Sequence, residues 1–220
     1  DRLMLVAADG RLADGDDLLY LLACDFQDRG RLRGPVVGTV MTNFGIETAL
    51  TKRGIVFERA AVGDRYVHQA LVAGGGVLGG EASGHLLCLD RASTGDALVN
   101  ALQVLDLLRR DGRTLAERLT EINRYPQKTV NVRVPGGRAL VASPAVVAAR
   151  RAVEEELAGG GRVVLRASGT EPVVRVTIEA AEATVVERLS ERLAGAVRAA
   201  QSRYVAGFSI RSPNHVTTPR

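Results

Sequence analysis

Residues 166–172, Arg166-Ala167-Ser168-Gly169-Thr170-Glu171-Pro172, join two apolar segments, 162–166 and 173–179, whose valines and isoleucine favour strands. A polar turn between two such segments predicts a β-hairpin. The other elements expected in this part of the chain are a strand over 129–134 and helices over 144–157 and 183–200. Together they predict a compact α+β module.

The polar turn of this hairpin is suited to a phosphate group. Gly169 gives the backbone the freedom to point successive N–H groups at an anion. Ser168 and Thr170 add hydroxyl donors, and Arg166 can bind two phosphate oxygens with its planar guanidinium. Arg175, on the second strand, can bring another guanidinium to the same turn. A Ser-Gly-Thr turn taken alone would more often be a plain hairpin tip, but the complete run predicts a phosphate site.

Upstream of this module, apolar strands alternate with helices of ten or more residues, a pattern typical of an α/β layered fold. Asp14 is the expected N-cap of the first helix. The other expected strands are 3–8, 36–40, 55–59 and 86–89, and the other expected helices are 43–53, 64–73, 94–111 and 115–122. Four leucines of the 94–111 helix recur at helical spacing: Leu98, Leu102, Leu105 and Leu108. The expected fold class is α/β, a layered domain with a mixed sheet followed by a smaller α+β domain.

A second polar run, Gly80-Glu81-Ala82-Ser83-Gly84-His85, combines a carboxylate, a hydroxyl and an imidazole on a turn flanked by glycines. Glu81 can accept hydrogen bonds from neighbouring sugar hydroxyls, and Ser83 can donate or accept them. His85 can move a proton near a reacting oxygen, although an isolated histidine would more often be structural. A phosphate site and a sugar site on one chain indicate a phosphosugar ligand.

The run Gly74-Gly75-Gly76-Val77-Leu78-Gly79 matches the Gly-x-Gly-x-x-Gly pattern of dinucleotide sites. Such a site needs a strand before the glycines and a helix after them. Here a helix is expected before them and a strand after them. We therefore reject a dinucleotide site.

The formal net charge of +4 suggests a nucleic-acid partner only at first sight. Residues 202–220 contain three arginines and no acid, so they supply +3 of that charge. Aromatic residues make up only 4% of the chain, and no basic cluster is interleaved with them. We expect no nucleic-acid partner.

Other compositional features favour a reduced, cytoplasmic setting. The chain has no apolar run of the roughly 18 residues that a transmembrane helix requires, and no signal-peptide pattern. Cys24 and Cys88 are isolated and lack the spacing of a metal or redox site. We expect no membrane association.

The residues of the two polar runs, and the order of the runs in the chain, resemble those of the α-D-phosphohexomutases. Residues 62–67, Val-Gly-Asp-Arg-Tyr-Val, and 94–96, Thr-Gly-Asp, resemble the branch of that family that acts on glucosamine phosphates. The branch that acts on mannose and glucose phosphates usually has Lys-x-Gly-His in place of the first. Ala82 departs from the glucosamine branch, which usually has Gln there. The resemblance extends over about residues 1–200.

The resemblance implies an enzyme that interconverts glucosamine 6-phosphate and glucosamine 1-phosphate through a phosphoserine and a bisphosphate intermediate. It implies that His85 and Arg2 take part in catalysis and that Glu81, Ser83 and Arg65 bind the sugar. The residues that it implies for the phosphate are Arg166, Ser168, Gly169, Thr170 and Arg175. The phosphoserine segment of the family has no counterpart in this chain, so we expect the missing N-terminal half of the enzyme to complete the site. A homodimer is compatible with this.

The family binds Mg²⁺ in a loop with the sequence Asp-Gly-Asp-Gly-Asp-Arg. Asp1 and Arg2 match its last two residues. The resemblance therefore implies Mg²⁺ as the cofactor of the intact enzyme, with Asp1 as one ligand. A single carboxylate does not make a Mg²⁺ site, so the site is expected to be incomplete in this chain.

Four segments are expected on this basis. They are residues 1–13, a remnant of domain 2; 14–123, the sugar-binding domain 3; 124–201, the phosphate-binding domain 4; and 202–220, a tail that is disordered or foreign to the protein. Two alternatives stay open: a phosphomannomutase/phosphoglucomutase, and a phosphosugar-binding module without catalytic activity.

Overall fold

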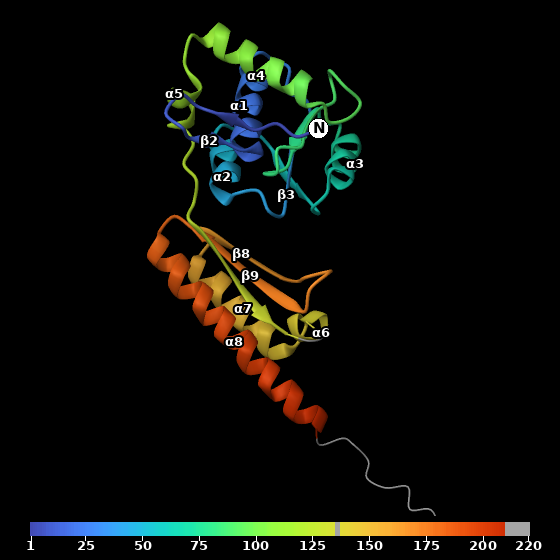
Figure 1. Ribbon diagram of the computed structural model, residues 1–220, viewed down its shortest axis with the longest axis vertical. Helices are drawn as coiled ribbons and strands as arrows, with labels where there is room; N and C mark the ends of the chain where they lie inside the picture. Colours follow the sequence, from blue (N-terminus) through green and yellow to red (C-terminus); the bar gives the residue numbers. More distant parts are fainter. Residues whose placement is uncertain (135–136, 210–220) are drawn as a thin grey trace, which may run out of the picture. The chain divides into compact units, whose positions relative to one another are not determined.

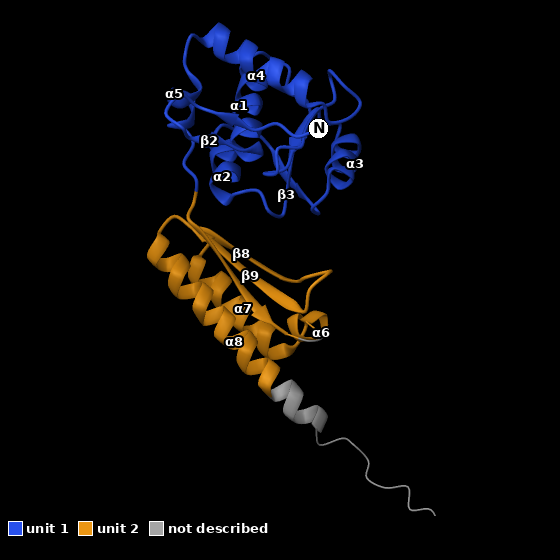
Figure 2. Cartoon of the chain, viewed as in Figure 1, with its two compact units in different colours: residues 1–124 blue, residues 125–220 orange. Residues whose placement is uncertain are grey.

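A computed structural model describes residues 1–134 and 137–209. The chain divides into two compact units, residues 1–124 and 125–220 (Figure 2). The division falls one residue after the boundary expected at 123/124. Residues 1–13, which were expected to be a remnant of a preceding domain, belong to the first unit.

The centre of the first unit is a four-stranded mixed sheet in the order β4-β3-β5-β6 (Figure 1). Its strands are β3 (Val36–Thr39), β4 (Phe57–Ala60), β5 (Leu78–Gly80) and β6 (Leu86–Cys88). Strand β3 is parallel to both β4 and β5, and β6 is antiparallel to β5. The expected α/β layered domain with a mixed sheet is confirmed.

Five helices and a short hairpin complete what the structure describes of this unit. The helices are α1 (Gly15–Asp28), α2 (Phe44–Lys52), α3 (Asp64–Gly74), α4 (Ala97–Asp111) and α5 (Leu115–Leu119), and the hairpin strands are β1 (Leu5–Val6) and β2 (Leu12–Ala13). Most of α1 is buried, since it contacts α2, α4 and β5. Asp14 caps α1 through a capping box with Asp17, as the sequence predicts.

Strand β5 was missed by the sequence analysis. Its residues Leu78-Gly79-Gly80 are all buried, but two glycines in three positions hide the strand signal. A Cβ on Gly79 would lie 2.8 Å from Val67 Cγ1 of α3 and 2.8 Å from the Val37 carbonyl oxygen of β3. Glycine is therefore needed here because α3 and β3 approach the strand closely. With α3 before the glycine run and β5 within it, the rejection of a dinucleotide site agrees with the structure.

The leucine pattern of α4 is misleading about burial. Leu98, Leu102 and Leu105 are 77%, 66% and 55% exposed, whereas Val104 and Leu107 face the core. Helical spacing identifies one side of a helix, but it does not say whether another element covers that side. The buried residues Val104 and Leu107 each come one position before a leucine of this pattern, Leu105 and Leu108.

The second unit contains a three-stranded antiparallel sheet in the order β7-β9-β8. Its elements are β7 (Gln127–Arg133), α6 (Gly137–Val141), α7 (Pro144–Leu157), β8 (Gly161–Ala167), β9 (Val173–Ala180) and α8 (Ala183–Ser209). Val174, Val176 and Ile178 of β9 are fully buried, as are Leu189 and Leu193 of α8. The expected α+β module is confirmed, and α6 is an addition to it.

Helix α8 is longer than expected. It was predicted to end at Ala200, with a tail from residue 202, but it continues to Ser209. Residues 210–220 of the predicted tail lie outside the described residues. Over the described part of the chain, no helix combines the length and apolar character needed to cross a lipid bilayer.

The two faces of α4 lead to a prediction about stability. Leu107→Ala should lower the free energy of unfolding by about 2–5 kcal/mol, since Leu107 is 3% exposed and its loss leaves a cavity. Leu105→Ala, two residues away on the exposed row, should change it by no more than about 0.5 kcal/mol. Urea denaturation followed by circular dichroism measures both. Equal losses would contradict the orientation of α4.

Candidate functional site

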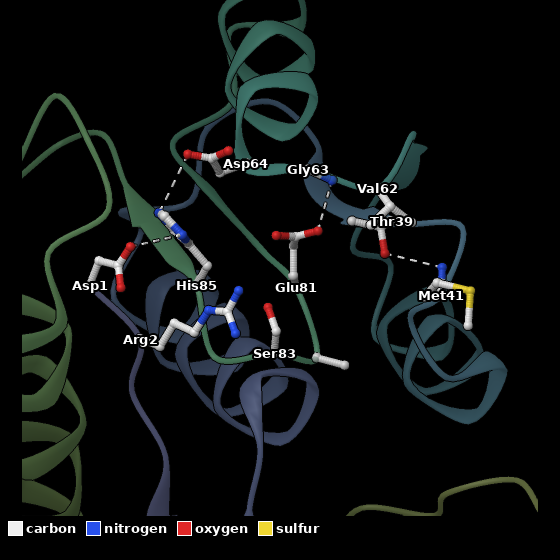
Figure 3. Close-up of a pocket in the computed structure, with 11 residues that line it drawn as sticks. Asp1, Arg2, Thr39, Met41, Val62, Gly63, Asp64, Glu81, Ser83 and His85 are labelled. Carbon is white, nitrogen blue, oxygen red and sulfur yellow. Dashed lines mark hydrogen bonds and ion pairs between the residues drawn. The ribbon is translucent and has the colours of Figure 1, made fainter. Parts of the chain in front are cut away.

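A pocket of about 530 Å³ lies in the first unit (Figure 3). It is lined by Asp1, Arg2, Thr39, Met41, Val62, Gly63, Asp64, Glu81, Ala82, Ser83 and His85. These residues come from the N-terminus, from the segments that follow β3 and β4, and from the connection between β5 and β6. The carboxyl ends of parallel strands are where α/β sheets commonly bind ligands.

The turn between β5 and β6 is held from two sides. The Leu3 N–H donates to the Gly84 carbonyl oxygen at 2.9 Å, and the Gly15 N–H at the start of α1 donates to Ala82 at 3.2 Å. Gly84 has φ +90°, and a Cβ there would overlap the Leu3 carbonyl oxygen. The glycine is therefore required both by the backbone conformation and by the close approach of the N-terminal segment.

Glu81 and Ser83, the two residues of this run that were expected to bind a sugar, both line the pocket. One oxygen of Glu81, Oε1, accepts a hydrogen bond from the Gly63 N–H at 2.9 Å. This contact orients the carboxylate and leaves its second oxygen to the pocket (Figure 3). Ser83 and Arg2 lie next to each other below Glu81 in the same view. The carboxylate and the hydroxyl of the β5–β6 connection therefore converge with a guanidinium from the N-terminal segment.

His85 lies between two carboxylates without a hydrogen bond to either. Its Nε2 is 3.9 Å from Asp64 Oδ2 and its Nδ1 is 4.0 Å from Asp1 Oδ2. The side chain is 12% exposed, and Nε2 has no hydrogen-bond partner within the described residues. A Cβ on Gly95 would overlap the imidazole, so this glycine makes room for His85. His85 therefore lines the pocket with one ring nitrogen unpaired within the described residues.

Arg65 is not brought into the pocket. Its guanidinium stacks over the Tyr66 ring, 4.7 Å from the ring centre, and donates to the Tyr66 hydroxyl at 2.8 Å. Asp64, beside it, does line the pocket, although the sequence analysis assigned it no role there. Asp64 is the first residue of α3, whose N-cap is Gly63. The signal for Asp64 was its position directly after the turn that follows β4.

A buried carboxylate fixes the start of α1, which contacts the turn between β5 and β6. Asp16 Oδ2 accepts from the Asn43 N–H at 2.8 Å, which joins the start of α1 to the N-cap of α2. Burial raises the pKa of Asp16 to about 6, and the Asn43 hydrogen bond opposes that rise. Arg124 binds the neighbouring Asp14 and Asp17. These contacts fix the N-terminal end of α1, whose Gly15 N–H donates to the turn between β5 and β6.

The second candidate site is the connection between β8 and β9. Arg166 and Arg175 are directly opposite each other in the antiparallel register, so both guanidinium groups lie on one face of the hairpin. Arg175 donates to Glu171 at 2.8 Å, while its Nε is buried and has no partner within the described residues. Arg166 makes no hydrogen bond or ion pair with any side chain that the structure describes. Like charges in this position repel each other unless an anion lies between them.

Several backbone N–H groups of the same turn already donate hydrogen bonds within the protein. The Ser168 N–H donates to the Val173 carbonyl oxygen at 2.8 Å. Ser168 Oγ accepts from the Thr170 and Glu171 N–H groups at 3.4 and 3.3 Å. Gly169 has open space around it and no positive φ. The arginine pair, rather than a preformed ring of N–H groups, is therefore the dominant anion-attracting feature.

The position of Gly84 can be tested by substitution. Gly84→Ala should lower the free energy of unfolding by about 1–2 kcal/mol for the positive φ, and by more for the overlap with Leu3. Gly10→Ala is the matched control, since Gly10 has φ +85° but open space around it, and it should show the first cost alone. Thermal or urea unfolding measures both. If Gly84→Ala lowers the free energy of unfolding no more than Gly10→Ala does, the close contact between Leu3 and Gly84 is contradicted.

Comparison with known proteins places these sites in context. Curated phosphoglucosamine mutases from Xanthomonas campestris pv. campestris are 58% identical to this chain over 200 residues, and one from Xanthomonas oryzae pv. oryzae is 56% identical. The matches cover 90% of this chain and 44% of each relative. The chain therefore spans less than half the length of the curated relatives it matches.

Solved structures agree with this fold. An N-acetylphosphoglucosamine mutase from Aspergillus fumigatus superposes with a TM-score of 0.77 at 25% identity, covering 90% of this chain and 46% of that one. A phosphoglucomutase/phosphomannomutase family protein from Burkholderia thailandensis superposes with a TM-score of 0.70 at 21% identity, covering 90% of this chain and 44% of that one, a likeness of fold alone.

Two family models match the chain in succession. Residues 14–125 match the description "Phosphoglucomutase/phosphomannomutase, alpha/beta/alpha domain III", and residues 130–196 match "Phosphoglucomutase/phosphomannomutase, C-terminal domain". The first match ends at residue 125, next to the division of the structure between residues 124 and 125, and the second begins at residue 130. The chain therefore belongs to the phosphoglucomutase/phosphomannomutase family and carries its domain III followed by its C-terminal domain.

Proposed function

We propose that this chain is the sugar- and phosphate-binding part of a phosphoglucosamine mutase, which interconverts glucosamine 6-phosphate and glucosamine 1-phosphate. The observation that carries the proposal is the convergence of Glu81, Ser83, His85 and Arg2 in one pocket. The 58% identity to curated phosphoglucosamine mutases supports the amino sugar as substrate.

Each pocket residue has a role that its geometry allows. Glu81, held by Gly63, presents its second oxygen to sugar hydroxyls, and Ser83 exchanges hydrogen bonds with the same ring. His85 accepts or donates the proton of the reacting hydroxyl through Nε2. Arg2 neutralises charge on the transferring phosphoryl group. Arg65, which lies outside the pocket, is proposed to bind the sugar only if its guanidinium leaves Tyr66.

Arg166 and Arg175 bind the phosphate that does not react. The pair carries two positive charges on one face of the hairpin, and a phosphate dianion offsets their repulsion. Ser168, Gly169 and Thr170 form the turn at the edge of this site. Holding one phosphate while the other end of the sugar is exposed allows either orientation of the substrate to be used.

The reaction is a phosphoryl transfer in two steps. A phosphoserine outside this chain gives its phosphoryl group to the free hydroxyl of the sugar monophosphate, which produces a bisphosphate and a free serine. The bisphosphate then reverses its orientation in the site, and its other phosphoryl group is transferred to the serine. Positioning and charge neutralisation supply most of the rate enhancement in such transfers.

This chain is proposed to supply only part of a magnesium site. A structure of the Aspergillus fumigatus enzyme is described as a complex with GlcNAc-6P and magnesium. In this chain Asp1 has an exposed side chain, and the described residues contain no group of three or more His, Cys, Asp or Glu side chains that would hold a metal. The residues present therefore do not form a Mg²⁺ site, and Asp1 is proposed as one ligand of a site completed from outside this chain. Cys24 and Cys88 are buried and free, which supports a reducing, cytoplasmic setting.

Turnover by a chimera tests the proposal. We expect residues 1–200, joined to the N-terminal part of the Xanthomonas campestris relative, to convert glucosamine 6-phosphate faster than glucose or mannose 6-phosphate. The isolated chain should show no turnover, because it lacks the phosphoserine. Preference for glucose or mannose phosphate would favour the phosphomannomutase/phosphoglucomutase alternative, and an inactive chimera that still binds phosphosugars would favour a binding module.

The same chimera tests Glu81. Hydrogen bonds to a charged group contribute about 1.5–3 kcal/mol, so Glu81→Ala should lower kcat/KM by about tenfold to a few hundredfold. Glu58→Ala, an exposed glutamate on β4, is the matched control and should leave kcat/KM unchanged. Unchanged efficiency for Glu81→Ala would mean that the turn is only structural.

The phosphate site is tested separately on the 220-residue chain by NMR titration with inorganic phosphate, glucosamine 6-phosphate and glucosamine. We expect the amide signals of Ser168–Thr170 to shift with the two phosphates and not with glucosamine. Arg166→Lys keeps the charge but loses the planar fork, so it should weaken phosphate binding, whereas Arg150→Lys on α7 should not. Equal shifts with glucosamine would argue against a phosphate site.

A further inference from the structure

The carboxylate of Asp64 lies in the sugar pocket without a hydrogen-bond donor. Asp64 is the first residue of α3 and its side chain is 58% exposed. The imidazole of His85 lies beside it, with Nε2 3.9 Å from Asp64 Oδ2, which is beyond hydrogen-bond distance. Within the described residues Asp64 accepts no hydrogen bond from a side chain or from the backbone. This carboxylate is therefore available to a ligand.

The groups that would neutralise Asp64 are held elsewhere. The adjacent Arg65 guanidinium stacks on Tyr66 and donates to the Tyr66 hydroxyl, and Arg65 is not among the residues that line the pocket. Arg2 lies beside Ser83, below Glu81 and away from Asp64 (Figure 3). The Gly63 N–H, one residue before Asp64, is used by Glu81. As a result, this side of the pocket presents two carboxylates, Asp64 and Glu81, on either side of Gly63.

We propose that Asp64 is a specificity-determining residue that binds the ammonium group at C2 of a glucosamine phosphate. This inference rests on the proposed function. The phosphates of such a ligand carry negative charge and its hydroxyls are neutral, so the ammonium group is its one cation. A carboxylate without an internal partner, on the wall of a sugar pocket, forms a charge-assisted hydrogen bond with that cation. With the C2 hydroxyl of a glucose phosphate it forms only a weaker hydrogen bond.

Two structural roles of Asp64 compete with this assignment. A negative side chain in the first turn of α3 favours the helix through the helix dipole. Asp64 also lies close enough to His85 to influence the imidazole through its charge. Neither role depends on the substituent at C2. Loss of either would change the binding of all sugar phosphates alike, whereas loss of an ammonium contact would change the binding of the amino sugar alone.

The experiment compares three ligands on the 220-residue chain. Dissociation constants for glucosamine 6-phosphate, glucose 6-phosphate and N-acetylglucosamine 6-phosphate are measured by NMR titration for the wild type, Asp64→Asn and Asp28→Asn. Glucosamine 6-phosphate carries the ammonium group, glucose 6-phosphate has a hydroxyl in its place, and the N-acetyl compound keeps the nitrogen without the charge. Asp28 is a 62% exposed aspartate at the end of α1 and controls for the change in net charge.

We expect the wild type and Asp28→Asn to bind glucosamine 6-phosphate about tenfold more tightly than the other two ligands, as one charge-assisted hydrogen bond in an open pocket allows. In Asp64→Asn this preference should disappear while glucose 6-phosphate binds as before. A preference that survives in Asp64→Asn would overturn the role of Asp64 and leave the proposed function intact. Binding of none of the three ligands by the wild type would overturn the proposed function and this inference with it.

Discussion

The contact between the N-terminal segment and the turn after β5 is the constraint on which the pocket depends. Leu3 donates to the Gly84 carbonyl oxygen, and the start of α1 donates to Ala82 in the same turn. A side chain at Gly84 would displace the first contact, and one at Gly15 would overlap the Glu81 carbonyl oxygen. Because the turn is held by backbone atoms on both sides, its side chains project into the pocket from a fixed base.

The two candidate sites have opposite electrostatic character. The pocket in the first unit combines Asp1, Asp64 and Glu81 with a single lining arginine. The hairpin of the second unit places Arg166 opposite Arg175, with Glu171 paired to the latter. An anionic phosphate suits the hairpin, and a sugar that carries hydroxyls and a cation suits the pocket.

The exposed leucines of α4 show that helical spacing of apolar residues does not by itself predict burial. Leu98, Leu102 and Leu105 form as regular an apolar row as any in the chain, yet all three are more than half exposed. Val104 and Leu107 are the residues that reach the core. The pattern reports which side chains share a side of the helix, whereas burial depends on whether another element packs against that side. The same limit applied to β5, where glycines removed the pattern from a buried strand.

Local sequence patterns were enough to predict the alternation of strands and helices, the cap of α1 by Asp14, and the two polar runs with their glutamate, serine, histidine and arginines. These are local properties, set by apolar spacing and by residue types that suit particular turns. The three-dimensional fold was needed to show that Asp64 lines the pocket while its neighbour Arg65 stacks on Tyr66, and that Arg166 lies opposite Arg175. Such outcomes depend on the register between strands and on the approach of segments far apart in the chain, and no spacing within one segment contains that information.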